Sequence, residues 1–298
     1  ISGFTLTKGG SLAGASGNNP HDTVGGGAFI EACVIVSNCF FTKNGQYDVY
    51  CASNAVVIDC DITKGSGVYC DWGFIRKSRV SKCPVGITGI GTIDGCMVTY
   101  NKTYGLYMYG IIGDVGAGVG LVTNCVIANN KGRGVYTYGS TISDCHIFRN
   151  KDGGVDACIC TVNNCIIYQN KTRIWGGGIV LVESLVKDCT ITSNTAYDGG
   201  GIWMRGWYCT NGLRNNIVSY NKARNKGGGV YLGQYTMLAN TLIVNNTAKS
   251  GGGVFVGERL DNTISIKNCT IACNVAKEHG GGVFKDGSTC AANLIIYN

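Results

Sequence analysis

The chain has 298 residues, of which 47 are glycine and 2 are proline, and only 14% of them are charged. This composition excludes a charged disordered chain and a proline-rich linker. No apolar run approaches the ~18 residues that a membrane helix needs. The net charge of +7 is a mild basic bias, which permits an acidic partner but is too weak to indicate nucleic acid.

One unit recurs along the whole chain. It reads Asp-Cys-Thr-Ile-Thr-Ser-Asn at residues 188–194 and Gly-Gly-Gly-Ile-Trp-Met at residues 199–204, and it returns in similar form at residues 268–285. Aligned on the cysteine position, thirteen units follow one another at intervals of 18 to 35 residues. Hydrophobic residues alternate with period 2, and the pattern breaks at Gly, Asn and Ser, which is typical of short strands.

We therefore predict an all-β fold in which residues 1–298 form one continuous right-handed parallel β-helix. It should have about thirteen turns with three short strands per turn. The irregular spacing favours the right-handed form, because left-handed hexapeptide solenoids usually keep a strict short period. Residues 10–25 and 111–119 break the repeat, and we interpret them as loop insertions.

Two positions of the repeat should build the interior. One is the cysteine position, and the other is an aliphatic position two residues later, as Ile191 follows Cys189. A buried free cysteine behaves as a small apolar residue, so we interpret the cysteine ladder as packing, with most of its thiols reduced. Cys33, Cys158, Cys160 and Cys209 are better placed to form disulfides. The cysteine ladder consists of Cys39, Cys60, Cys96, Cys125, Cys145, Cys165, Cys189 and Cys269.

Five residues after the cysteine position comes asparagine. Asparagine tolerates the left-handed backbone of a sharp corner, and stacked side-chain amides can hydrogen-bond from turn to turn. We therefore predict an asparagine ladder at one corner. Its members are Asn44, Asn101, Asn130, Asn150, Asn170, Asn194, Asn221, Asn246 and Asn274.

An aromatic column should run along the outer face of the second strand. Stacked rings on adjacent strands can be purely structural. A long exposed apolar stripe can instead bind sugar rings, or be covered by a partner chain or a loop. The sequence leaves these alternatives open. The aromatic column consists of Phe29, Tyr50, Tyr69, Tyr107, Tyr136, Trp203, Tyr231, Phe255 and Phe284.

A basic column follows the asparagine ladder, because lysine comes directly after asparagine in several turns. It is either a solvated corner or a docking stripe for an acidic polysaccharide or an anionic cell surface. Its members are Lys102, Lys131, Lys151, Lys171 and Lys222.

The repeat resembles those of bacterial surface β-helices. Gly26-Gly27-Ala28-Phe29 and the Ile-x-x-Asn of residues 191–194 are similar to the Gly-Gly-Ala-Ile and Phe-x-x-Asn tetrapeptides of the polymorphic outer membrane proteins. The resemblance covers almost the whole chain. It implies an extracellular or cell-surface rod that serves in adhesion or as a passenger.

From these features we predict a non-enzymatic extracellular or cell-surface rod, which acts as a structural or adhesive element. Both ends of the chain fall inside a strand pattern, so we expect self-association or continuation at both ends, as in a filament. The alternative is a polysaccharide-binding or polysaccharide-degrading β-helix, a lyase or a hydrolase. Weak catalytic candidates for it are His146, Arg149, Lys151 and Asp156, with Asp61 and Arg79 further off.

No other chemistry is indicated by the sequence. The cysteines lack the spacing of a zinc site, there are only 3 histidines, and no calcium-type cluster of aspartates occurs. Paired carboxylates at glycosidase spacing do not recur on neighbouring turns. We therefore expect no metal, no cofactor and no membrane span.

Overall fold

The computed structural model describes residues 1–9, 26–31, 33–110, 120–206, 211–257, 264–285 and 290–297. Within these residues the chain forms strands and no helix, so none of them provides a helix that could cross a membrane. The chain divides into two compact units, Ile1–Ser140 and Thr141–Asn298. The loop insertions predicted at residues 10–25 and 111–119, and Cys209, lie outside the described residues.

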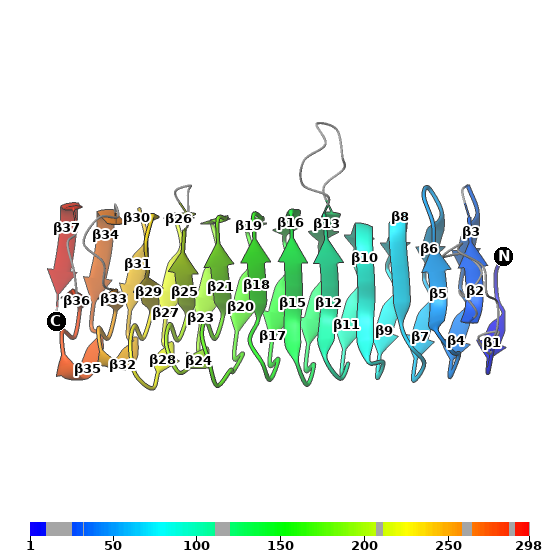
Figure 1. Cartoon of the computed structure of the whole chain (residues 1–298), viewed down its shortest axis with the longest axis horizontal. Coiled ribbons are helices and arrows are strands. Elements are labelled where there is room, and N and C mark those ends of the chain that lie inside the picture. Colours follow the sequence, from blue (N-terminus) through cyan, green and yellow to red (C-terminus); the bar gives the residue numbers. More distant parts are fainter. Residues whose placement is uncertain are drawn as a thin grey trace. The chain divides into compact units, whose positions relative to one another are not determined.

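In unit 1 each turn contributes strands to three parallel columns (Figure 1). Each strand pairs with the strand one turn later, so a column is a parallel sheet that runs across the turns. The first column holds β1 (Thr5–Thr7), β4 (Phe40–Thr42), β7 (Asp61–Thr63), β9 (Arg79–Ser81), β11 (Met97–Thr99) and β14 (Val126–Ala128). The second column holds β2 (Gly26–Ile30), β5 (Tyr47–Cys51), β8 (Val68–Arg76), β10 (Val85–Asp94), β12 (Tyr104–Tyr109) and β15 (Arg133–Tyr138).

The third column of unit 1 shows a departure from three separate strands per turn. It holds β3 (Ile35–Ser37), β6 (Val56–Ile58), the second halves of β8 and β10, and β13 (Gly120–Thr123). β8 and β10 thus pass through the second corner without interruption. The register of this pair shifts between Ile90 and Gly91, and Gly89 and Gly91 have φ of 119° and 151°. Two glycines in a region that other residues rarely adopt let the strand bend where other turns break.

Unit 2 repeats the three columns. The first holds β17 (His146–Phe148), β20 (Ile166–Tyr168), β23 (Thr190–Thr192), β27 (Ile217–Ser219), β31 (Leu242–Val244) and the second halves of β34 (Ile264–Ala272) and β37 (Cys290–Tyr297). The second holds β18 (Val155–Cys158), β21 (Ile179–Val182), β25 (Ile202–Arg205), β29 (Val230–Leu232), β33 (Val254–Val256) and β36 (Val283–Lys285). The third holds β16 (Ser140–Ser143), β19 (Thr161–Asn163), β22 (Leu185–Lys187), β26 (Asn211–Arg214), β30 (Thr236–Ala239) and the first halves of β34 and β37.

Unit 2 also contains a small parallel sheet that the sequence did not predict. It forms directly after the asparagine position, where several turns continue in extended backbone before the glycine run. Its strands are β24 (Thr195–Ala196), β28 (Lys222–Ala223), β32 (Thr247–Ser250) and β35 (Val275–His279).

The core follows from period-2 alternation in the first column. The middle residue of each three-residue strand points inward, and Phe41, Ile62, Val80, Val98 and Ile127 are at most 1% exposed. Each such side chain contributes about 1.5–3 kcal/mol when it leaves water. The residues on either side of it point outward and form the surface of the first column.

Each first-column strand ends at a residue in the left-handed backbone conformation. Lys64 and Lys82 both have φ of 60°, and Tyr100 has φ of 59°. Contrary to the prediction from the sequence, the left-handed residue is the one before the ladder asparagine, and none of the ladder asparagines has positive φ. The reason is that the ladder side chain must point inward to reach its neighbours, while the residue before it makes the corner and points outward.

Candidate functional site

Asparagine side chains bond the turns together at the corner after the first column. Asn170 donates its side-chain amide to Asn194 Oδ1 at 3.1 Å and to Ile147 O at 2.9 Å. Its backbone N–H donates to the same Oδ1 of Asn194 at 2.9 Å. Side-chain bonds of this kind join Asn101 to Asn130 in unit 1, and in unit 2 Asn150 to Asn170, Asn194 to Asn221, Asn221 to Asn246, and Asn246 to Asn274.

The asparagine ladder is interrupted at Gly65, and the buried side chain of Asp48 fills the gap. Asp48 Oδ1 accepts the side-chain amide of Asn44 at 3.0 Å, and its Oδ2 accepts the Gly67 N–H at 2.9 Å. A Cβ on Gly65 would lie 2.0 Å from Asp48 Oδ1, so the carboxylate takes the space of a ladder side chain. Burial raises the pKa of Asp48, against the hydrogen bonds from Gly67 and Asn44 that lower it.

The cysteine ladder is a row of buried side chains that also form hydrogen bonds. Cys189 Sγ donates to Lys187 O at 3.1 Å, and it accepts the Cys165 N–H at 3.4 Å. The Cys189 N–H in turn donates to Asn216 Oδ1 at 2.9 Å. The position thus favours a small side chain that both donates and accepts, as Ser78, Asn216 and Thr241 also do. Cys39, Cys60, Cys96, Cys125, Cys145, Cys165, Cys189 and Cys269 are all at most 2% exposed.

No disulfide joins any of the cysteines that the structure describes. Cys33, Cys158 and Cys160, for which the sequence favoured pairing, are among them. Cys33 is exposed and Cys160 is buried, so these residues occupy different environments.

The aromatic column forms ring stacks on the second column, with a break at Thr88 between Tyr69 and Tyr107 in unit 1. In unit 1, Tyr50 stacks on Phe29 at 4.9 Å and on Tyr69 at 5.1 Å, and Tyr107 stacks on Tyr136 at 4.9 Å. In unit 2 the stack runs through Trp203, Tyr231, Phe255 and Phe284, and the stack begins at Trp175, which the sequence did not indicate.

Inside each stack of the aromatic column, neighbouring rings cover both faces of a ring. Phe255 is completely buried and Tyr50 is only 9% exposed. Lys226 covers the ring of Phe255, with Nζ 4.5 Å from its centroid. Sugar rings pack on aromatic faces, and inside a stack each face already touches another ring. The arrangement therefore suits a structural role better than a sugar platform.

The basic column and the weak catalytic candidates lie at exposed corners and on separate columns. Lys102, Lys131, Lys151, Lys171 and Lys222 are all exposed. His146 lies on β17 of the first column, whereas Asp156 lies on β18 of the second. Arg149 donates to Gln169 Oε1 at 2.8 Å and lies over Phe148. The structure thus places His146 and Asp156 on different faces of the same turn.

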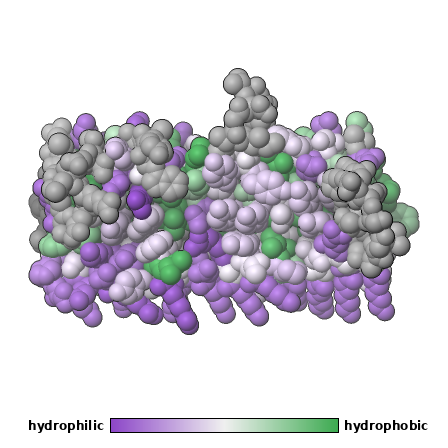
Figure 2. Space-filling view, in the orientation of Figure 1, coloured by the Kyte–Doolittle hydropathy of each residue, from purple (hydrophilic) through white to green (hydrophobic). Residues whose placement is uncertain are grey.

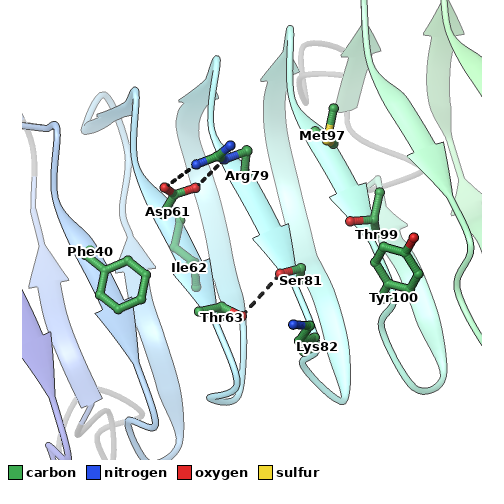
Figure 3. Close-up of a pocket in the computed structure, with 10 residues that line it drawn as sticks. All are labelled: Phe40, Asp61, Ile62, Thr63, Arg79, Ser81, Lys82, Met97, Thr99 and Tyr100. Carbon is green, nitrogen blue, oxygen red and sulfur yellow. Dashed lines mark hydrogen bonds and ion pairs between the residues drawn. The ribbon is translucent and has the colours of Figure 1, made fainter.

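A groove of about 340 Å³ crosses the outer surface of the first column in unit 1 (Figure 3). Four consecutive strands, β4, β7, β9 and β11, carry its side chains side by side. Phe40 lies at one end of the groove and Tyr100 at the other, and they are 38% and 56% exposed. The lining consists of Phe40, Asp61, Ile62, Thr63, Arg79, Ser81, Lys82, Met97, Thr99 and Tyr100.

Two polar pairs span adjacent strands in the middle of this groove. Arg79 donates to both carboxylate oxygens of Asp61, through Nε at 2.5 Å and Nη2 at 2.6 Å. The hydroxyls of Thr63 and Ser81 share a hydrogen bond of 3.2 Å. The bond to the Arg79 guanidinium lowers the pKa of Asp61, so the carboxylate stays ionised at neutral pH.

The sequence indicated Asp61 and Arg79 only as distant candidates, and it missed Phe40, Lys82 and Tyr100. The first outward position of these strands, which holds Phe40, Asp61 and Arg79, follows no repeat, so its alignment across turns becomes informative only when the register is known. Tyr100 and Lys82 occupy the corner before the asparagine position, and reading that position turn by turn would have found them.

Comparison with known proteins places the fold. Residues 75–218 match the family model described as right handed beta helix region. Two mannuronan C-5 epimerase A-modules from Azotobacter vinelandii are similar in structure. AlgE4 has a TM-score of 0.58 at 11% identity over 99% of this chain and 91% of its own, and AlgE6 has a TM-score of 0.52 at 13% identity over 88% and 90%.

The chain is a right-handed parallel β-helix. The periplasmic alginate epimerase AlgG is a further solved structure similar to this β-helix, with a TM-score of 0.52 at 14% identity over 89% of this chain and 75% of its own. No curated protein matches the sequence. At such identities the similarity establishes the fold of the β-helix, and the predicted fold class is confirmed.

The same comparisons contradict the main functional prediction. A non-enzymatic structural or adhesive rod was the first interpretation of the repeat, yet the three solved β-helices named above are alginate or mannuronan epimerases. They favour the alternative, a β-helix that binds or modifies a polysaccharide. The repeat misled because its cysteine, aliphatic and asparagine positions build the fold and carry no information about the ligand.

Proposed function

We propose that this β-helix binds a polysaccharide in the groove over β4, β7, β9 and β11. The observation that carries the proposal is the combination of side chains in one open groove. Two exposed aromatic rings bound it, and a carboxylate, a guanidinium, hydroxyls and an ammonium group line it. Aromatic rings pack on the apolar faces of sugars, and the polar groups can hydrogen-bond their hydroxyls.

The polar groups in the groove are already ordered. Asp61 and Arg79 fix each other through two bonds, and so do the hydroxyls of Thr63 and Ser81 through one. Side chains that are held in place before binding lose less conformational entropy when the ligand arrives. A location outside the cytoplasm, as for the periplasmic AlgG, suits a protein with such a ligand.

The first test is a substitution at one end of the groove. Tyr100→Ala should weaken binding to polysaccharide about five- to tenfold, because the loss of one aromatic contact costs about 1 kcal/mol. Affinity electrophoresis and calorimetry with alginate, polygalacturonate and a neutral mannan would measure this loss.

Tyr220→Ala is the matched control for Tyr100→Ala. Tyr220 is 63% exposed, has left-handed backbone and precedes the ladder residue Asn221, as Tyr100 precedes Asn101. It belongs to unit 2 and is not among the residues that line the groove. Equal binding of the wild type and Tyr100→Ala to every polymer, or equal losses in the two variants, would contradict the proposal.

Modification of a bound uronate is the second candidate function. Asp61 is the single carboxylate of the lining, and Arg79 keeps it ionised, whereas glycoside hydrolysis normally uses two carboxyl groups. The lining does offer Lys82 and Tyr100 for proton transfer, next to cations that can neutralise a carboxylate. Abstraction of the proton beside that carboxylate, with its return from the other face, would invert the sugar carbon. Proton NMR of alginate incubated with the protein would detect this change.

A further inference from the structure

A row of lysines runs beside the groove along the corner of unit 1. Lys8, Lys43, Lys64 and Lys82 directly follow β1, β4, β7 and β9. These four strands pair in register, Thr7 with Thr42, Thr42 with Thr63, and Thr63 with Ser81. The row therefore presents one ammonium group per turn, at the strand spacing of ~4.8 Å. We call these four residues the lysine comb.

The corner itself does not require lysine. All four residues have left-handed backbone, with φ of 58°, 55°, 60° and 60°. Glycine or asparagine adopts this conformation at a lower cost than lysine. At the same position the later turns carry one basic residue among mostly uncharged ones, namely Tyr100, Asn129, Arg149, Gln169, Ser193, Tyr220, Asn245 and Cys273. Four consecutive lysines at a position that favours other residues point to a use for their charge.

No carboxylate of the described residues pairs with the charges of the lysine comb. All four lysines are exposed, and within the described part of the chain none of them forms an ion pair. The nearby carboxylate of Asp61 is engaged by Arg79. In Figure 2 hydrophilic side chains project in a row along the lower edge, where the loops after β4, β7 and β9 lie in Figure 1. Like charges at this spacing repel one another, so an anionic ligand would relieve the repulsion.

A row of hydroxyls accompanies the lysine comb. Each of its lysines is preceded by Thr7, Thr42, Thr63 or Ser81, and these side chains point outward in the first column. The result is a strip in which a hydroxyl and an ammonium group alternate once per turn. Such a strip fits a linear polymer that carries hydroxyls and carboxylates at regular intervals and lies across the strands.

We propose that the lysine comb binds an acidic polysaccharide lengthwise, one carboxylate-bearing stretch per turn, along the edge of the groove. This inference rests on the proposed function, since the comb and the groove share the turns of β4, β7 and β9 and hold the same polymer. It adds that the ligand is a polyuronate and not a neutral glycan, and that Lys8, Lys43 and Lys64, which lie outside the groove lining, contribute to affinity.

The test compares two variants of equal charge. In the first, Lys8, Lys43, Lys64 and Lys82 are all changed to glutamine. In the second, the same change is made at Lys102, Lys131, Lys171 and Lys222 of the basic column. Calorimetry would measure binding of polygalacturonate oligomers of increasing length at several salt concentrations. The comb variant should bind long oligomers at least about fourfold more weakly, since each of the four lost contacts is worth ~0.2–1 kcal/mol.

The salt and length dependence separate the comb from the groove. The wild type should gain affinity with oligomer length up to the span of the comb, and its affinity should fall as salt rises. In the comb variant both dependences should flatten, while the basic-column variant should behave as the wild type. Circular dichroism of both variants would verify that they fold.

Three results would overturn the lysine comb as a binding site for polyuronate. Equal losses in the two variants would show a general charge effect. An unchanged affinity of the comb variant, with wild-type binding intact, would remove this inference and leave the proposed function standing. Equally tight binding of double-stranded DNA would show a general polyanion surface. Failure of the wild type to bind any polysaccharide would instead remove the proposed function itself.

Discussion

The residue that departs furthest from the repeat is Asp48. Nothing in the cysteine, aliphatic or asparagine positions predicts a buried carboxylate on the second strand of that turn. The position of Asp48 is explained by Gly65, which occupies the ladder position of the next turn. Because glycine has no side chain, Gly65 offers no acceptor to the side-chain amide of Asn44. Asp48 supplies that acceptor and also binds the Gly67 N–H. Gly65 and Asp48 together therefore take the place of one ladder asparagine.

A double-mutant cycle would test this coupling. Asp48→Ala leaves buried donors on Asn44 and Gly67 without acceptors and should lower the free energy of unfolding by about 2–4 kcal/mol. Gly65→Asn alone should be destabilising, because its Cβ would lie 2.0 Å from the carboxylate. The double variant should recover most of the loss by restoring the ladder. Urea denaturation measures all four proteins, and simple additivity would contradict the coupling.

The pH dependence of stability provides a second measurement on the same proteins. Because burial raises the pKa of Asp48 above its unfolded value of 3.8, the folded state holds this proton more tightly than the unfolded state. The contribution of Asp48 to stability therefore falls as pH rises from 3.8 through the folded pKa. The double variant should lack this fall.

At the scale of the element, the adjacent strands β7 and β9 determine the electrostatics of the groove. Asp61 and Arg79 face each other in register, so the guanidinium is neutralised although it is 68% exposed. Neither residue belongs to a repeating position. The sequence could therefore place each strand but could not show that these two outward side chains meet.

Asp61→Asn should release the charge of Arg79 for a ligand. We expect the affinity for polyuronate to rise a few-fold and the affinity for a neutral glycan to stay within error. The free energy of unfolding should change by less than about 1 kcal/mol, because the pair is exposed. Lowering the pH should not reproduce the effect, because the lowered pKa of Asp61 keeps it ionised until the carboxylates of the polyuronate are themselves protonated. Calorimetry on the wild type and variant checks both points, and weaker polyuronate binding by the variant would contradict this role.

At the scale of the whole molecule, the fold was predictable because its determinants are local and recur. Cys189, Ile191 and Asn194 stand at fixed spacings within one strand and corner, and the same spacings return in most turns. The merged strands β8 and β10 were not predictable, because Gly89 and Gly91 replace a corner without leaving a strand pattern. Whether residues 1–298 form one continuous β-helix, and whether it associates end to end, stay predictions.

Thiol alkylation would report on the integrity of the β-helix. In the native protein, iodoacetamide should label the exposed residues Cys33 and Cys273 within minutes, and the buried cysteine ladder only after denaturation. Peptide mass spectrometry measures both rates. Rapid labelling of Cys165 or Cys189 in the absence of denaturant would contradict the buried ladder.

The strict register of the first column has a consequence for how such a protein could change during evolution. Each turn from β4 to β9 adds one strand, one hydroxyl and one lysine, whatever the length of the loops that connect the other columns. A tandem duplication of the segment from Asp61 to Ser78 would therefore add one lysine to the comb, and it would keep a glycine next to Asp48. The length of the preferred oligomer would then be set by a whole number of turns. Gene duplication or deletion could lengthen or shorten it by repeating or removing contacts that already exist.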